Sequence, residues 1–210
     1  MDPEYPDCLF IQFAREPVAG AVKTRMMPHL SPQEACALHA ELVLWTAGTL
    51  VAANLGRVEL AVAGEAGHAL FEACLGLGVA GLTLQRGANL GERMYDALVA
   101  GLDRFGRVVL VGSDCPFIDR SYLRQALEAL QRVDVVLGPA ADGGYTLVGA
   151  RRVPREMFED ISWGTAAVFT ETTGQLRRLG LPWAELPTLN DVDRPEDLAA
   201  WMTLRAARGR

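Results

Sequence analysis

The sequence contains few cysteines and histidines, and their positions exclude the sites that these residues usually build. No Cys-x-x-Cys pair occurs, and the two residue types do not group into a set of zinc ligands. We therefore expect reduced thiols, a cytoplasmic location and no zinc site. The residues concerned are Cys8, Cys36, Cys74 and Cys115, with His29, His39 and His68.

Positive charge and long apolar runs are also scarce. The chain has 20 Lys and Arg against 26 Asp and Glu, so its formal net charge is −6. This balance argues against a nucleic-acid partner, although it leaves room for a local basic pocket. No apolar run approaches the length of a membrane span, and the acidic start at residues 1–4 is unlike a secretion signal. We expect no membrane span.

What the sequence does contain fits one α/β domain. A chain of 210 residues, half of them hydrophobic, can bury a substantial core, and no repeat, low-complexity tract or linker divides it. Apolar strand patterns alternate with helical ones. This predicts a single domain over residues 1–210, a three-layer α/β/α sandwich with a mostly parallel mixed sheet. The expected strands are 8–13, 57–63, 82–85, 108–111, 133–139 and 146–149; the expected helices are 31–53, 68–75, 89–102, 119–130, 165–179 and one from 195.

The stretch from Val108 to Pro116 looks like the centre of the sheet. Four consecutive branched aliphatic residues, 108–111, indicate a strand that is buried on both faces. Asp114 follows directly after this strand, where ligands bind in open α/β sheets. A carboxylate there can hold Mg²⁺ against a phosphate, whereas an isolated Asp would more often cap a turn or helix.

A basic loop follows the first strand. Arg15, Lys23 and Arg25 flank Pro17 and Gly20, a pattern typical of irregular backbone. Exposed amides and cations in such a loop suit nucleotide phosphates, and substitutions there should cost little stability. The loop is not a P-loop, because Val22 rather than glycine precedes Lys23.

Three glycine-containing turns are further candidates. In 86–94, Asn89 can cap a helix and two glycines allow close backbone approach to a base or ribose. Residues 142–144 form either a hairpin turn or a ligand-facing loop with exposed amides. In 161–165, Ser162 or Thr165 can cap the next helix, and Trp163 is more often a packing residue than a stacking platform.

Two acids precede the last predicted helix. Asp191 and Asp193 are separated by one residue, and Pro195 suits the first helical position after a cap at Asp193 or Arg194. One acid can simply cap the helix. Together they are a second supply of metal ligands.

These segments together resemble a known family. The stretch from Phe13 to Met26 resembles the signature FA(K/R)xPxxGxVKTRL of a bacterial glycosyltransferase-A-like transferase family, whose members are often called radical-SAM/selenodomain-associated transferases or arsenosugar-biosynthesis glycosyltransferases. The segments 90–94, 112–116, 142–145, 163–165 and 191–198 agree with it in order, over about residues 8–200. Arg194 replaces the usual Thr, and the helix from His39 to Thr49 matches poorly. More distantly, the layout is similar to phospholactate and molybdenum-cofactor guanylyltransferases.

The resemblance implies a role for each matching residue. It implies Mg²⁺ or Mn²⁺ held by Asp114 with Asp193, or with Asp191 as the alternative. Lys23, Arg25 and Asp114 would act in the transfer itself. The implied nucleotide contacts are Ala14, Arg15, Gly20, Lys23, Arg25, Gly87, Asn89, Gly91 and Ser113. The residues implied to face the acceptor or sugar are Asp142, Gly143, Gly144 and Trp163.

The family resemblance leaves three functions open. A glycosyltransferase would move a sugar from a nucleotide-sugar donor to a small-molecule acceptor, with the metal ion stabilising the departing diphosphate. A nucleotidyltransferase would join an NMP to a phosphorylated small molecule and release pyrophosphate. A non-catalytic nucleotide-binding module is the third reading, which the intact acids and basic loop make less favourable. We expect the glycosyltransferase; the sequence leaves the donor base, the acceptor and the oligomeric state open.

Overall fold

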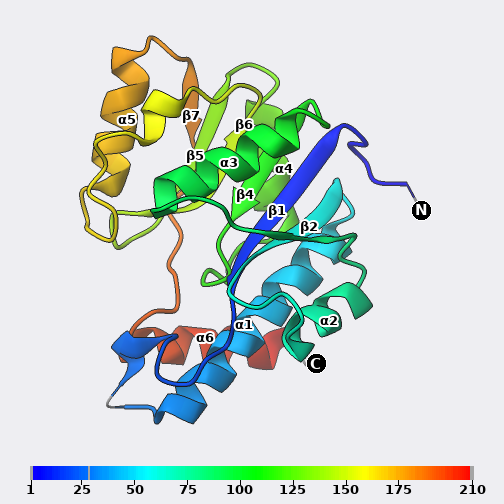
Figure 1. Ribbon diagram of the computed structural model, residues 1–210, viewed down its shortest axis with the longest axis vertical. Coiled ribbons are helices and arrows are strands. Elements are labelled where there is room, and N and C mark those ends of the chain that lie inside the picture. The colour runs from blue at the N-terminus through cyan, green and yellow to red at the C-terminus, as the bar shows by residue number, and fades with distance from the viewer. Residues whose placement is uncertain (1, 28, 209–210) are drawn as a thin grey trace.

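The computed structural model describes residues 2–27 and 29–208 and contains one seven-stranded sheet, ordered β3-β2-β1-β4-β6-β5-β7 (Figure 1). Strand β6 runs antiparallel to both of its neighbours, and the other pairings are parallel. The predicted mostly parallel mixed sheet is therefore confirmed. The strands are β1 Cys8–Arg15, β2 Arg57–Ala63, β3 Leu82–Leu84, β4 Arg107–Val111, β5 Val135–Pro139, β6 Tyr145–Ala150 and β7 Trp183–Glu185.

Helices cover both faces of the sheet and make three layers. One core cluster joins the sheet to α1, α2 and α4, and a second joins the opposite face to α3 and α5. Figure 1 shows α6 beside α1, although they come from opposite ends of the chain. Trp45 and Trp201 join them edge to face, with ring centroids 4.9 Å apart. The helices are α1 Pro32–Ala53, α2 Ala69–Gly76, α3 Leu90–Leu102, α4 Arg120–Ala129, α5 Val168–Arg178 and α6 Leu198–Arg208, with short 3₁₀ helices η1 Thr24–Met26, η2 Arg155–Phe158 and η3 Pro195–Asp197.

Strand β4 lies in the middle of the core, as its composition predicts. Val108 and Leu110 belong to the cluster on one face of the sheet, and Val109 and Val111 to the cluster on the other. All four side chains are buried. Because both faces are covered, alternation of polar and apolar residues is absent and the strand is continuously aliphatic.

Most helices begin where local signals in the sequence predict. Ser31 and Glu34 form a capping box at α1, and Asn89 and Asp119 cap α3 and α4. The expected cap of α5 at Ser162 or Thr165 is wrong, because the helix begins at Val168 without a side-chain cap. The Thr165 hydroxyl instead accepts a hydrogen bond from Ala167 N (3.2 Å) and stabilises the preceding turn.

The sequence did not reveal two features. Strand β7 has only three residues at the sheet edge, so it shows no readable period. Helix α1 is long and apolar enough to cross a membrane by length and composition alone, contrary to the expectation that no such segment exists. Its apolar residues, including Leu42, Val43 and Leu50, pack in the core clusters, which accounts for that composition.

Candidate active site

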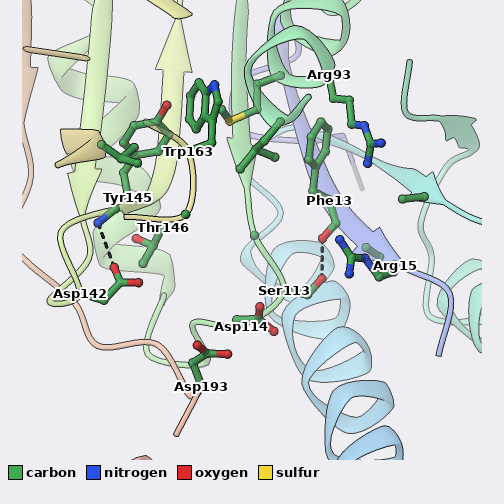
Figure 2. A pocket seen from close by; sticks show the side chains of 18 of the residues that line it. Phe13, Arg15, Arg93, Ser113, Asp114, Asp142, Tyr145, Thr146, Trp163 and Asp193 are labelled. Atoms are coloured by element: carbon green, nitrogen blue, oxygen red, sulfur yellow. Dashed lines mark hydrogen bonds between the residues drawn. The ribbon is translucent and has the colours of Figure 1, made fainter. Parts of the chain in front are cut away.

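A cleft of about 680 Å³ opens at the edge of the sheet where β1 and β4 end. Because β6 is antiparallel, the turn that precedes it lies at the same edge. Ligands of open α/β sheets bind at this edge. We call this space the main cleft; Figure 2 shows side chains of its lining, among them Phe13, Arg15, Asp114, Asp142, Trp163 and Asp193.

At the bottom of the main cleft, Asp114 is paired with a buried ammonium group. Lys23 Nζ lies 2.7 Å from Asp114 Oδ1 and 3.9 Å from Asp193 Oδ1. It also donates a hydrogen bond to the Val192 carbonyl at 2.6 Å. The Lys23 side chain is only 2% exposed, whereas that of Asp114 is 49% exposed. The buried ammonium group of Lys23 therefore fixes the Asp114 carboxylate at the surface of the cleft.

A second ion pair ties the first loop to the C-terminal segment. Arg25 Nη1 donates to Asp193 Oδ2 at 2.7 Å. The same segment is fixed by its backbone, because Val192 N donates to the Asp114 carbonyl at 2.8 Å. Three stretches that are far apart in sequence, 23–25, 114 and 192–193, thus meet at one point.

Of the two C-terminal acids, Asp193 lines the main cleft and Asp191 does not. Burial, together with the charge of nearby Asp142, raises the pKa of Asp191 from 3.8 to about 6. The positions agree with Asp193 as the better-placed partner of Asp114.

The loop itself differs from its predicted form in one respect. It is irregular, with Gly20 at φ 81° and Lys23 at φ 50°, both left-handed. However, Lys23 is buried rather than on the surface. The expectation that its substitution costs little stability assumed a surface position. Because the buried ammonium group is the shared partner of two carboxylates, we now expect a larger cost. Its contact with a phosphate stays a prediction, and Gly20 lies outside the lining of the main cleft.

Polar side chains beneath the cleft join α1 to the sheet. Gln12 is fully buried, and its amide donates to the Val43 carbonyl (3.0 Å) and to Ser113 Oγ (2.8 Å). Ser113 Oγ in turn donates to the Phe13 carbonyl at 2.7 Å (Figure 2). Ser113, a predicted nucleotide contact, thus lines the cleft, but its hydroxyl group already donates a hydrogen bond to the backbone of β1.

His39 lines the main cleft, which no feature of the sequence predicts. Its Nε2 lies 2.9 Å from the Arg15 carbonyl, so Nε2 carries the proton and donates. Burial lowers the pKa of this imidazole. In the neutral ring with the proton on Nε2, Nδ1 is a hydrogen-bond acceptor. No sequence motif marked this contact, which joins α1 to the end of β1.

The predicted contacts around α3 divide between two clefts. Asn89 lines the main cleft, but Gly87 and Gly91 line only a second cleft of about 620 Å³ on the other side of Asn89 and Trp163. Packing explains why a glycine stands at position 91, because a Cβ there would lie 2.5 Å from the Trp163 indole. Gly87 has φ 138°, which favours glycine.

The turn before β6 brings Asp142 into the main cleft. Asp142 Oδ1 accepts a hydrogen bond from Gly144 N at 2.9 Å, an Asx turn that orients the carboxylate. Gly143 is outside the lining; it has φ 91°, and a Cβ there would collide with the Ala166 backbone. Trp163 lines both clefts, with its ring edge to face with Tyr145 at 6.4 Å between centroids.

The acids fit a metal ion that shares its ligands with a substrate. Among residues 2–27 and 29–208, no three Asp, Glu, His or Cys side chains form a ready-made metal cage. Mg²⁺ at phosphate sites, however, takes one or two protein carboxylates and completes its shell with water and phosphate oxygens. Asp114 and Asp193 both reach the cleft and both approach Lys23 Nζ. The chemistry of these two carboxylates is compatible with such a site.

The buried ammonium predicts an unequal effect of two substitutions. Lys23→Met removes an ion pair and a buried hydrogen bond, so the free energy of unfolding should fall by about 1–3 kcal/mol. Arg25→Met is the matched control, because its side chain is 49% exposed, and it should cost only about 0–1 kcal/mol. Denaturant unfolding of both variants measures the difference, and equal losses would contradict the structural role of Lys23.

The raised pKa of Asp191 predicts a pH-dependent stability. The folded state holds this proton more tightly than the unfolded state, so Asp191 costs stability as pH rises from about 4 to about 6. In a metal-chelating buffer, Asp191→Asn should raise the unfolding temperature above pH 6 and have little effect near pH 4. A stabilisation that is the same at both pH values would contradict the assigned shift.

Comparisons with known proteins agree with this geometry. The model of the DUF2064 family, described as "Uncharacterized protein conserved in bacteria", matches residues 46–165. The chain is 31% identical over 179 residues to 2-phospho-L-lactate guanylyltransferase from Methanothermobacter thermautotrophicus, covering 84% of this chain and 76% of the relative.

Solved structures show the same fold. A candidate nucleotide-diphospho-sugar transferase from Desulfovibrio desulfuricans G20 superposes with a TM-score of 0.82 at 34% identity, over 90% of this chain and 83% of the other. A CMP:2-keto-3-deoxy-manno-octonic acid synthetase in complex with CTP shares the fold, with a TM-score of 0.60 at 11% identity over 96% of this chain and 99% of the other. The expected resemblance is confirmed: the chain belongs to the DUF2064 family and has the glycosyltransferase-A-like fold of nucleotide-diphospho-sugar transferases.

Proposed function

We propose that the protein is a glycosyltransferase that moves a sugar from a nucleoside-diphosphate sugar to a small-molecule acceptor. One observation carries this proposal: Asp114 and Asp193 meet Lys23 and Arg25 in the main cleft. Two carboxylates that are held in place by cations at the end of a sheet suit a divalent cation, which a nucleotide-dependent transferase uses to bind phosphates. A volume of about 680 Å³ is within the range of ligand sites.

Asp114 and Asp193 would hold the divalent cation, Mg²⁺ or Mn²⁺, together with the donor's phosphates. When bound, the ion would supply positive charge that stabilises the leaving nucleoside diphosphate. Lys23 fixes the position of both carboxylates from below, and Arg25 orients Asp193 from the side.

Two further cations are available for the donor. Arg15 and Arg93 line the main cleft, and neither forms an ion pair among the described residues. Arg93 is oriented by a hydrogen bond from Nε to the Gly87 carbonyl (3.1 Å). Figure 2 shows both arginines on the side of the cleft that carries β1 and α3. Binding the donor there would place its diphosphate against charge that is already positioned.

A nucleotidyltransferase of the guanylyltransferase kind is the second candidate. The sequence identity to 2-phospho-L-lactate guanylyltransferase favours this candidate, because the alignment covers most of both chains. The same carboxylates and cations would serve attack on the α-phosphorus of an NTP. The two candidates differ in the products that they release.

The product assay tests the proposal. Slow transfer to water is expected even without the true acceptor, because the donor is already positioned. With Mg²⁺ or Mn²⁺, the purified protein should release a nucleoside diphosphate from at least one of a panel of nucleotide-sugars. Coupled detection of diphosphate and pyrophosphate follows both reactions in parallel. Pyrophosphate from an NTP, with no diphosphate from any sugar donor, would favour the second candidate; tight nucleotide binding with neither product would favour a non-catalytic module.

The metal role of Asp114 has its own test. Asp114→Asn should keep the fold with some loss of stability, because Asp114 Oδ1 is the buried partner of Lys23 Nζ, while the Val192 carbonyl and Asp193 remain beside the ammonium group. A neutral amide is, however, a poorer Mg²⁺ ligand. We expect the variant to lose the metal-dependent part of nucleotide affinity in titration calorimetry while keeping the metal-free part. Asp160→Asn, in the second cleft, is the charge-matched control and should bind normally. An unchanged dependence on Mg²⁺ in Asp114→Asn would contradict the assignment.

A further inference from the structure

Figure 2 shows Arg15 and Arg93 on one side of the main cleft and Asp142 on the other, with Asp114 and Asp193 between the two sides. The donor wall consists of the end of β1, the first loop and the start of α3. The acceptor wall consists of the turn before β6, the start of β6 and residues 163–168. All the cations in the lining belong to the donor wall: Arg15, Lys23, Arg25 and Arg93.

The acceptor wall offers an acid, hydroxyl groups and an aromatic surface. Asp142 is its charged group, and within the described part of the chain no Lys or Arg of this wall lines the cleft. Asp142 Oδ1 is used by Gly144 N, which leaves Oδ2 directed into the cleft (Figure 2). Thr146, Thr165 and the ring of Trp163 complete the surface.

The cations nearest to this wall are already used. Lys23 and Arg25 each lie 2.7 Å from a carboxylate oxygen, of Asp114 and Asp193 respectively. Arg15 and Arg93 stand across the cleft, where the donor's phosphates would occupy them. The donor wall therefore has no cation to spare for a second phosphate group on the opposite side.

Two backbone amides near the start of α5 are already used within the protein. The start of α5 faces the acceptor wall, and a helix N-terminus is otherwise a ready anion site. Here Phe169 N donates to the Gly143 carbonyl (2.9 Å), and Ala167 N donates to Thr165 Oγ1 (3.2 Å). The Phe169 and Ala167 amides are therefore not free to bind an anion.

A phosphate monoester would be poorly accommodated on such a wall. It carries a charge of about −1.5 to −2 at neutral pH and needs Arg, Lys or free amides to offset its dehydration. We propose that the acceptor is an uncharged molecule without phosphate, and that one of its hydroxyl groups donates a hydrogen bond to Asp142 Oδ2. This inference rests on the proposed function, because it takes the donor wall to be filled by the nucleotide.

The test compares two acceptors that differ only in the phosphate group. Glycerol and glycerol 3-phosphate are supplied at equal concentration with the nucleotide-sugar that releases diphosphate, and glycosylated products are quantified by mass spectrometry. Glycerol should be preferred by about tenfold or more, since the phosphate is repelled by a nearby carboxylate at low effective dielectric. Equal or greater use of glycerol 3-phosphate would overturn the inference.

Two variants test whether Asp142 is responsible for the preference for glycerol. Asp142→Asn keeps an oxygen for Gly144 N but removes the charge and the free acceptor atom, so the preference for glycerol should fall by about threefold or more. Glu156→Gln makes the same change of net charge on η2, outside both clefts, and should leave the preference intact. An unchanged preference in Asp142→Asn would overturn the role of this residue.

A binding measurement keeps the inference independent of turnover. Phenyl phosphate is titrated into protein saturated with nucleoside diphosphate and Mg²⁺. Absence of a second binding event supports the inference, whereas binding with a Kd tighter than about 1 mM would overturn it. If no nucleotide-sugar releases diphosphate, the proposed function fails, but this titration still reports on the acceptor wall.

Discussion

The buried ammonium group of Lys23 is the interaction on which the candidate site depends. An ammonium group inside a protein is stable only when anionic or carbonyl oxygens surround it. Here Asp114 and the Val192 carbonyl bind it directly, and Asp193 lies near. Because Lys23 and its partners come from three distant stretches of the chain, the first loop, the end of β4 and the C-terminal segment cannot move independently. The strained backbone of Lys23, at φ 50°, is the local cost of this arrangement.

The topology of the sheet explains why two chemically different walls face each other. Strands β1 and β4 are parallel and end at the same edge, which places the basic loop beside Asp114. Strand β6 is inserted antiparallel next to β4, so the turn carrying Asp142 reaches that edge from the opposite direction. One wall is therefore built from the N-terminal half of the chain and is basic. The other comes from the C-terminal half and is acidic and aromatic.

This division of charge helps to distinguish glycosyl transfer from nucleotidyl transfer, which the same fold can carry out. A fold does not determine a reaction, and the site must be read from its side chains. The donor wall, with Arg15 and Arg93 unpaired among the described residues, suits a nucleotide in either reaction. The two reactions place different demands on the acceptor wall, because an enzyme that joins an NMP to a phosphorylated acceptor would need cations there. The composition of this wall is the basis of our proposal that the acceptor is a neutral hydroxyl group.

The sequence by itself determined the fold class, the buried strand at 108–111, the helix starts at 31, 89 and 119, and the place of Asp114 after the central strand, because each depends on neighbours within a few residues. Only the tertiary structure decided that Lys23 is buried, that His39 lines the cleft beside Arg15, and that Gly91 makes room for Trp163. These features join residues from 24 to 169 positions apart in the chain. No local pattern encodes such contacts, since they arise only when the sheet brings the segments to one edge.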